Sequence, residues 1–280
     1  MRAAGATAAA AGLLLLLLLL RRRRAAQPSP LVGILGGLGP LASALLTRLI
    51  VDEGERAGAQ FDDEHSCFIL YQNPLLPNSR RAALGEGPSP LPGMVTTFRA
   101  LARAGATEVC VCCNTAHPYA RAAAAQVGVP FLDMIELTAE AALLRIGAAS
   151  STRPRLTVGI LGTDATLQMG LYQDALAAAA RLMLGDAERV CFALPDATGT
   201  AALQQCILDI KAGACTGVGE RIEHVARQLV TAGAECIITG CTELPVCFND
   251  VDSHATFPVP IVSPVSTLAA AIVRRASHAS

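Results

Sequence analysis

Two cysteines occupy matching places in a repeated stretch of the sequence and have the types and surroundings for chemistry. Cys113 ends an apolar run and is followed by Asn114 and Thr115, and Cys241 ends a second apolar run and is followed by Thr242. Each run follows an Ala-Gly-Ala sequence whose glycine precedes the cysteine by eight residues. A thiol at the start of a helix has a lowered pKa and can act as a base, a nucleophile or a metal ligand.

The repeat extends upstream of the cysteines. Val-Gly-Ile-Leu-Gly occurs at residues 32–36 and again at 158–162, which lie 81 and 83 residues before the respective cysteines. We therefore predict a duplicated α/β unit with one thiol in each half.

A role shared by both thiols favours proton transfer over nucleophilic catalysis. A cysteine nucleophile usually has a neighbouring histidine base, and His117 follows Cys113 by four residues, but the second copy has no histidine there. A thiolate and a thiol on opposite faces of a tetrahedral carbon can remove a proton from one side and return one on the other. That chemistry is racemisation or epimerisation.

Apolar runs alternate with helical patterns from Leu31 onward, which predicts parallel sheets covered by helices. The predicted strands are 31–35, 66–71, 108–113, 128–132, 156–161, 189–194, 235–240 and 259–262. The predicted helices are about 40–58, 94–104, 118–127, 134–147, 169–184, 200–212, 218–232 and 264–277. The expected fold is α/β, with two similar four-stranded halves about a pseudo-twofold axis.

The expected active site is a cleft between these halves. Ligands bind beyond the carboxyl ends of parallel strands. Gly36–Pro40 and Gly162–Asp164 follow the first strand of each half, and Cys113 and Cys241 end the third. If the halves face each other, both thiols point into one cleft. The predicted domains are 31–132 with about 263–280, and 133–262.

Two motifs have other interpretations. The glycines from Gly36 to Gly39 resemble a dinucleotide loop but do not match its spacing, so a tight turn is favoured. Cys110 and Cys113 form Cys-x-x-Cys, but Cys110 falls within a predicted strand and no second pair exists, so we expect no metal site. The remaining cysteines are interpreted as core or incidental thiols.

Composition limits the partners and the compartment. The formal net charge of −1 argues against a nucleic-acid partner. Ten cysteines, mostly in apolar runs, favour a reducing compartment, cytoplasmic or organellar. Residues 1–30 are rich in alanine, leucine and arginine and contain no acidic residue; a signal, an anchor, an organellar presequence and a low-complexity extension all stay open.

The motifs together resemble the aspartate/glutamate racemase family, in particular its aspartate racemase branch. The matching segments run from about Leu31 to Ala276 and occur in family order. They are Gly36-Gly-Leu-Gly-Pro40, Asn73-Pro-x-x-Pro77, Cys113-Asn-Thr-Ala-His117, Gly162-Thr163 and Gly240-Cys-Thr-Glu-Leu244. The resemblance implies a two-domain fold, commonly dimeric, and a racemase that uses two cysteines and no cofactor.

The resemblance also implies the substrate contacts. Asn114, Thr115 and Thr242 would hold the α-carboxylate and the amino group. The other expected contacts, taken from the shared motifs and from the lone lysine of the chain, are Gly37, Asn73, Thr163, Glu243 and Lys211. A racemase that uses pyridoxal phosphate needs a Schiff-base lysine, and Lys211 lies in a helix-end context without a phosphate-binding loop.

One segment departs from the family pattern. The family usually has Asp-Arg-Thr after Asn-Pro-x-x-Pro, whereas this chain has Asn78-Ser79-Arg80-Arg81. We expect Arg80 to bind the side-chain carboxylate of an acidic substrate, aspartate or glutamate, with Arg81 and Lys211 as alternatives. The alternatives for the whole protein are a related isomerase, of the hydantoin racemase or maleate isomerase type, and an amino-acid-binding protein without catalysis.

Overall fold

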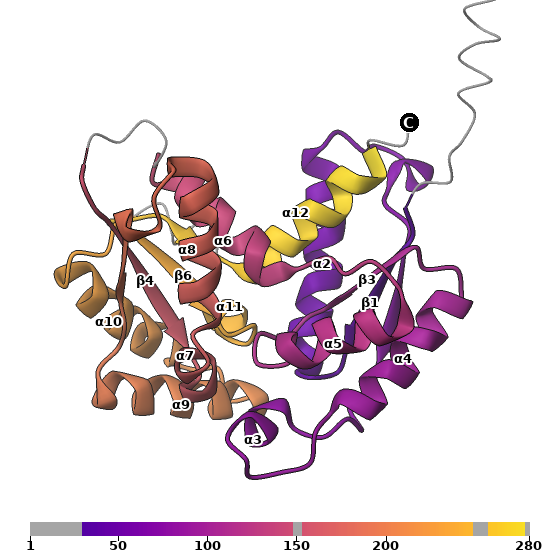
Figure 1. The fold of residues 1–280 in the computed structure, drawn as a ribbon, viewed down its shortest axis with the longest axis horizontal. Coiled ribbons are helices and arrows are strands. Elements are labelled where there is room, and N and C mark those ends of the chain that lie inside the picture. Colours follow the sequence, from indigo (N-terminus) through magenta and orange to yellow (C-terminus); the bar gives the residue numbers. More distant parts are fainter. Residues whose placement is uncertain (1–29, 148–152, 249–256, 278–280) are drawn as a thin grey trace, which may run out of the picture.

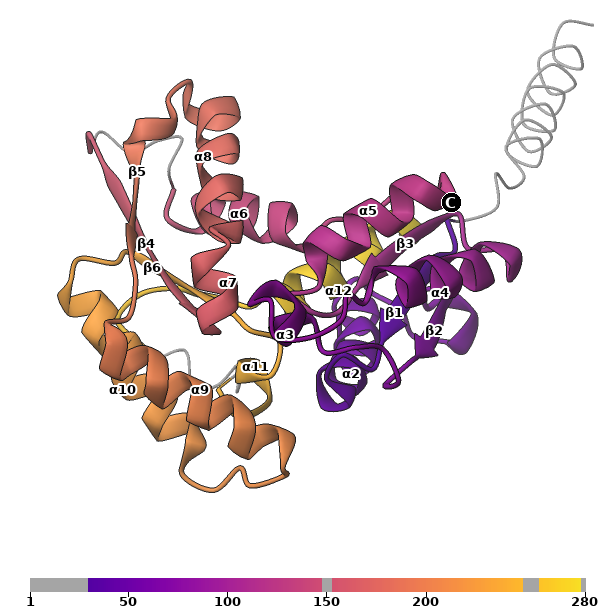
Figure 2. The same ribbon diagram turned by 60° about the horizontal axis from the view of Figure 1, so that its bottom comes forward.

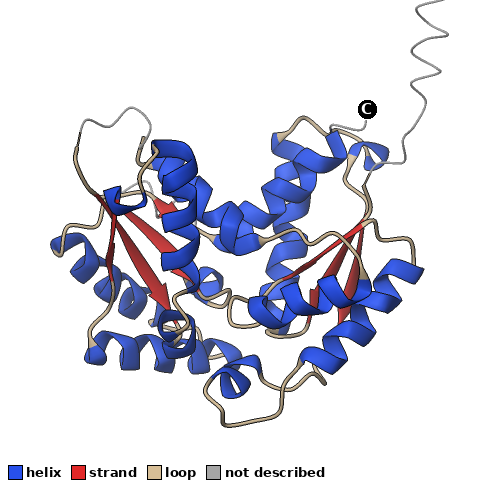
Figure 3. Ribbon diagram, viewed as in Figure 1, coloured by secondary structure: helices blue, strands red, loops and turns tan. Residues whose placement is uncertain are grey.

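The protein forms two lobes, each built on a parallel sheet with helices on both sides (Figures 1 and 3). A computed structural model describes residues 30–147, 153–248 and 257–277. The N-terminal extension considered above falls outside these residues, apart from Pro30. Among the described residues, none forms a helix long and apolar enough to cross a membrane.

All strands in both sheets pair in parallel, as the alternating pattern predicted. The first sheet has the order β2-β1-β3 and the second has the order β5-β4-β6-β7. The strands are β1 (Val32–Gly36), β2 (Phe68–Gln72), β3 (Glu108–Val111), β4 (Leu156–Gly162), β5 (Val190–Ala193), β6 (Cys236–Gly240) and β7 (Ile261–Val262). The first strand of each half therefore lies next to the second and the third, which repeats one topology in the two lobes.

The fourth strand predicted for the first half is reduced to a single bridge between Val109 and Phe131, so the expected count of four is wrong for that lobe. Val109 N–H donates to Pro130 O at 2.9 Å, and in the second lobe Ile237 N–H donates to Pro260 O, also at 2.9 Å. Proline has no N–H to continue a ladder, which keeps both segments short. The equivalence of the halves thus extends to single hydrogen bonds.

Helices cover both faces of each sheet (Figure 2). In the first lobe, α4 and α5 pack on one face of the sheet, and α2 and α12 pack on the other. In the second lobe, α9 and α10 pack on one face, and α6 and α8 pack on the other. The helices are α2 (Pro40–Arg56), α3 (Ser79–Ala83), α4 (Leu91–Arg103), α5 (His117–Val127), α6 (Met134–Arg145), α7 (Asp164–Gln168), α8 (Leu171–Leu184), α9 (Ala197–Lys211), α10 (Val218–Thr231), α11 (Leu244–Cys247) and α12 (Pro264–Ser277).

The two halves exchange their last helices. Asp133 caps the start of α6, and its carboxylate accepts hydrogen bonds from the backbone N–H groups of Ile135 and Glu136. From this start α6 crosses to the second lobe, where it joins the core around β4, and α12 crosses in the same way to the core around β1. Each lobe is therefore completed by a helix that follows the other lobe's sheet. The domain boundaries inferred from the sequence stay a prediction.

Three short helices were not predicted, and all follow strands at the rim where ligands are expected. They are α3, α7 and α11. The helix expected at 169–184 is α8, which begins at Leu171 because Gly170, in a left-handed conformation with φ of 64°, separates it from α7. Helices of four or five residues have too few turns to show a 3.6-residue period.

Candidate active site

The carboxyl ends of the strands in the two lobes face each other, and several contacts join the lobes there. A loop glycine, Gly39, meets Glu243 of the second lobe so closely that an added Cβ would overlap the carboxylate. The φ of Gly39 is 143°, which disfavours residues with a side chain. The glycine-rich turn predicted from the sequence thus makes room for a carboxylate of this chain.

Cys113 lies just beyond β3 and is buried, with 7% of its surface exposed. Its Sγ atom is 3.7 Å from the hydroxyl oxygen of Ser79 and 3.9 Å from that of Thr115, and in each contact either atom can be the donor. Ser79, on the unpredicted helix α3, is itself buried. The first thiol is therefore surrounded by hydroxyl groups.

Cys241 lies just beyond β6 in the equivalent place and is also buried. Its thiol donates a hydrogen bond to Glu243 Oε2 at 3.1 Å, and the Thr242 hydroxyl donates to the same oxygen at 3.3 Å. The other oxygen of Glu243 pairs with the ammonium group of Lys211 from the end of α9. The second thiol is therefore bound to a carboxylate, and this environment differs from that of the first.

Burial is the main cause that raises the pKa of both thiols. Glu243 raises both pKa values further and Lys211 lowers both, so one ion pair acts on the two thiols. The Ser79 hydroxyl lowers the pKa of Cys113, whereas the hydrogen bond to Glu243 raises that of Cys241. The lowered pKa expected for a thiol at a helix start is not found, because burial outweighs the backbone hydrogen bonds from Ala116 to Cys113 and from Glu243 to Cys241, which lower the pKa.

His117 is turned away from the Cys113 thiol. Its Nδ1 atom lies 2.9 Å from the Cys113 carbonyl oxygen, and its Nε2 atom lies 3.7 Å from Asp133 Oδ1. Burial lowers the pKa of His117, which favours the neutral ring. A neutral ring that donates from Nδ1 to the carbonyl offers no base to the thiol. The structure therefore agrees with the sequence argument against a histidine-activated nucleophile.

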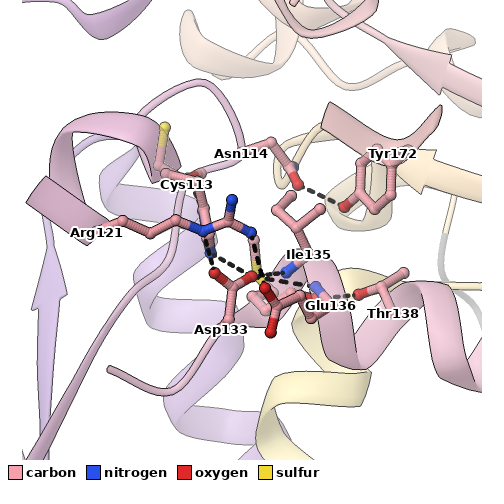
Figure 4. Close-up of polar contacts among 10 residues, drawn as sticks. Cys113, Asn114, Arg121, Asp133, Ile135, Glu136, Thr138 and Tyr172 are labelled. Carbon is pink, nitrogen blue, oxygen red and sulfur yellow. Dashed lines mark hydrogen bonds and ion pairs between the residues drawn. The ribbon is translucent and has the colours of Figure 1, made fainter. Parts of the chain in front are cut away.

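Asp133 lies behind this segment and is paired with Arg121 (Figure 4). Although burial alone would raise the pKa of Asp133, the hydrogen bond from Arg121 lowers it overall. Figure 4 shows the Cys113 sulfur pointing away from this pair. The Asp133–Arg121 pair thus supports the start of α6 and does not contact the thiol.

Tyr172 is a site residue that the sequence analysis missed. From α8 in the second lobe its hydroxyl donates a hydrogen bond of 2.6 Å to Asn114 Oδ1 in the first lobe (Figure 4). Both residues are buried, and Asn114 Nδ2 has no hydrogen-bond partner within the described structure. With its carbonyl oxygen fixed by Tyr172, the Asn114 amide has a donor available for a ligand oxygen.

Arg80 also crosses between the lobes, but its partner belongs to the chain itself. Its guanidinium donates two hydrogen bonds, of 2.7 and 2.6 Å, to the two carboxylate oxygens of Asp164 at the start of α7. The hydrogen bond with Asp164 raises the pKa of Arg80, and the bond from Arg80 lowers the pKa of Asp164. Arg81 instead donates to the Glu86 carbonyl oxygen on the exposed side of α3.

The remaining predicted contacts have structural partners. The backbone N–H of Gly37 donates to the Ser43 hydroxyl at 3.0 Å, and the Asn73 amide donates to the Thr97 hydroxyl at 3.1 Å. The hydroxyl of Thr163 caps α7 by accepting from a backbone N–H of that helix. Their roles as substrate contacts stay predictions.

A cavity of about 1080 Å³ lies elsewhere in the molecule, between α2, α6 and α12. Its lining includes Glu53, Glu140 and Arg274, and it contains neither cysteine. The chemistry of paired thiols therefore belongs to the rim at the carboxyl ends of the strands and not to this cavity.

Two parallel-sheet lobes that face each other across the ends of their strands define a two-domain racemase fold. The chain belongs to the Asp/Glu/hydantoin racemase family, whose model matches residues 35–272. The recognition made from the paired cysteine motifs is thereby confirmed.

Individual relatives support this assignment. The structure is similar to Picrophilus torridus aspartate racemase, with a TM-score of 0.69 and 25% identity over 89% of this chain and 94% of that one. An aspartate racemase homologue from Pyrococcus horikoshii has the same fold, with a TM-score of 0.65 and 19% identity over 88% of this chain and 99% of that one. In sequence, the broad specificity amino-acid racemase RacX of Bacillus subtilis is 22% identical over 87% of this chain and 96% of its own length.

Proposed function

We propose that this protein is an amino-acid racemase in which Cys113 and Cys241 exchange protons with the two faces of the substrate α-carbon. The observation that carries this proposal is that both thiols are buried just beyond equivalent strand ends, and that Glu243, which accepts a hydrogen bond from Cys241, raises the pKa of both. We place the substrate α-carbon between the two thiols, with one sulfur on each side.

The two environments assign starting roles to the thiols. Cys241 donates its proton toward Glu243, so in the resting enzyme it is the acid. Cys113 is bordered by the hydroxyls of Ser79 and Thr115, which can donate to a thiolate, so it is the base. The Cys113 thiolate takes the α-proton as the C–H bond breaks, and Cys241 gives its proton to the opposite face. The enzyme is then left with the reverse protonation state, which acts on the other enantiomer.

The polar groups at the two cysteine segments have the chemistry to hold the substrate carboxylate. Asn114 Nδ2 is a buried donor without a partner in the described structure, whereas the Thr115 and Thr242 hydroxyls would have to leave their present contacts with Cys113 and Glu243 to donate to the substrate. Negative charge moves onto the carboxylate oxygens when the α-proton leaves. Fixed donors in a buried site stabilise that charge more than water does.

Lys211 is poorly suited to form a Schiff base with pyridoxal phosphate. Although burial alone would lower its pKa, the Glu243 carboxylate raises it overall, so the amine is held in its protonated form. A Schiff-base nucleophile must be a neutral amine. We therefore propose that proton transfer uses the cysteines alone, as the resemblance to cofactor-independent racemases implied.

The named relatives indicate two different substrate classes. The similarity to the aspartate racemase of P. torridus favours an acidic substrate for this protein. The similarity to RacX, which is described as a broad specificity enzyme, favours a wider range of substrates. The acidic substrate expected from the sequence depends on a cation that is free to bind a second carboxylate. The expected homodimer stays a prediction.

The proposal is tested by a chiral assay of the purified protein with L-amino acids, combined with single cysteine variants. We expect Cys113→Ser and Cys241→Ser each to lower racemisation by about 10²- to 10⁴-fold, because a hydroxyl is a far weaker acid and base than a thiol. Cys67→Ser, at an exposed thiol, is the matched control and keeps wild-type activity. Wild-type racemisation in either active-site variant would refute the two-base proposal.

A further inference from the structure

The α3 segment presents an uncharged side chain to the proposed base. Ser79, at the first position of α3, is buried and places its hydroxyl 3.7 Å from the Cys113 sulfur. Asn78 fixes this position by capping the helix, and its side-chain oxygen accepts from the Arg81 backbone N–H at 3.0 Å. The group that this segment brings to the reacting thiol is therefore a neutral hydroxyl.

The neighbouring guanidinium is paired with a carboxylate of the second lobe. Arg80 and Asp164 form a two-pronged ion pair, and Asp164 is also held by the backbone N–H of Ala165 at 2.7 Å. A carboxylate at a helix start is additionally stabilised by the helix dipole. For Arg80 to bind a substrate carboxylate, both hydrogen bonds to Asp164 must break and leave that carboxylate without its partner.

The other two cations considered for this role are engaged as well. Lys211 is paired with Glu243, and the Arg81 guanidinium donates to the Glu86 carbonyl oxygen. A second substrate carboxylate would therefore meet cations that Asp164 and Glu243 already neutralise. It would have to compete with these carboxylates for the charge-assisted hydrogen bonds that they accept.

We infer, on the basis of the proposed racemase function, that the substrates are amino acids with neutral side chains, such as alanine and serine, and that the Arg80–Asp164 pair excludes acidic ones. The α-carboxylate has neutral donors at Asn114, whereas a side-chain carboxylate has no free cation at Arg80. This inference replaces the acidic preference expected from the sequence. It makes Asp164, which the sequence analysis did not select, a specificity-determining residue.

The inference is tested by the exchange of the α-proton in D₂O, measured for L-Ala, L-Ser and L-Asp with the wild-type protein and with Asp164→Asn. The wild-type protein is expected to exchange L-Ala and L-Ser faster than L-Asp. Asp164→Asn releases the guanidinium, so the ratio of kcat/KM for L-Asp to that for L-Ala should rise roughly 10- to 100-fold. Asp164→Ser is a second variant that keeps a polar residue at the helix start. Asp209→Asn, which removes the partner of Arg221 on the surface, is the matched control and leaves the ratio unchanged.

The outcomes separate this inference from the function on which it rests. Faster exchange of L-Asp than of L-Ala by the wild-type protein would overturn the inference and keep the racemase. An unchanged ratio in both folded Asp164 variants would also overturn it. If the protein exchanges the α-proton of none of the amino acids tested, the proposed function is overturned, and the inference with it.

Discussion

The hydroxyl of Tyr172 lies 2.6 Å from Asn114 Oδ1, and this hydrogen bond connects the two cysteine segments. The Tyr172 ring lies over Gly240, where an added Cβ would come within 2.9 Å of it. Gly240 precedes Cys241, and Asn114 follows Cys113. A single side chain therefore contacts the backbone next to one thiol and orients the amide next to the other.

Removing the hydroxyl should impair catalysis through Asn114. In Tyr172→Phe the Asn114 carbonyl oxygen loses its donor and the amide is no longer held with Nδ2 available to the substrate. We expect kcat/KM to fall about tenfold or more, and the free energy of unfolding to fall by about 1–3 kcal/mol, the usual cost of a buried group left without a partner. Steady-state kinetics and urea unfolding measure the two effects.

Tyr71→Phe is the matched control, because Tyr71 is exposed on β2. It should change neither quantity. A Tyr172→Phe protein with wild-type kcat/KM would show that this hydrogen bond does not position the amide for catalysis.

Ser79 should set the pH dependence of the proposed base. The pKa of Cys113 is raised by burial and by Glu243, and the Ser79 hydroxyl partly offsets this. The thiolate fraction, and with it kcat/KM, should therefore increase as the pH rises above neutrality. In Ser79→Ala the pKa rises further, so the ascending limb of the profile moves to higher pH.

The rate at which iodoacetamide modifies Cys113, followed by mass spectrometry, gives the same pKa without any assumption about the substrate. Ser79→Thr retains a hydroxyl and should restore the wild-type profile. If Ser79→Ala leaves both pH profiles where they are, the hydroxyl does not stabilise the thiolate.

Gly39→Ala should disturb the junction of the lobes. The φ of Gly39 is 143°, and an added Cβ would overlap Glu243, which binds both Cys241 and Lys211. We expect a loss of about 1–3 kcal/mol in the free energy of unfolding from backbone strain, together with a larger loss of activity from displacement of Glu243.

Gly58→Ala separates the two causes. Gly58 also has a positive φ, of 106°, but an added Cβ there meets no atom within 4 Å. It should therefore share the strain without the loss of activity. Equal activity in the two variants would contradict a functional contact between Gly39 and Glu243.

The features that the sequence predicted well are those encoded by the repeat. The strand ends at Cys113 and Cys241 follow from apolar runs of similar length after matching glycines, and both thiols are buried beyond their strands. The crossed helices α6 and α12 likewise follow from regular apolar spacing. Periodicity indicates which face of an element is buried, and these elements are long enough to show it.

The features that it missed depend on contacts between distant residues. The pair between Arg80 and Asp164 was not predicted, because the two residues are 84 positions apart and no local pattern connects them. Tyr172 lies in an ordinary helical run, so nothing in its neighbourhood marked it. Glu243 was expected at the site only because it belongs to a shared motif, and its hydrogen bond with the Cys241 thiol was not predicted. Pairing across two lobes is determined by how they pack, and this information is not local.

The central claim, that each thiol serves one face of the α-carbon, is tested most directly by deuterium exchange with separate enantiomers. Each enantiomer of alanine is incubated in D₂O with Cys113→Ser or Cys241→Ser, and deuterium at the α-carbon is measured in the recovered enantiomer and in its mirror image. We predict that each variant loses racemisation but still exchanges the α-proton of one enantiomer, and that the two variants retain opposite enantiomers. Loss of exchange for both enantiomers in one variant, with both retained in the other, would show that a single thiol performs the chemistry and would contradict the account.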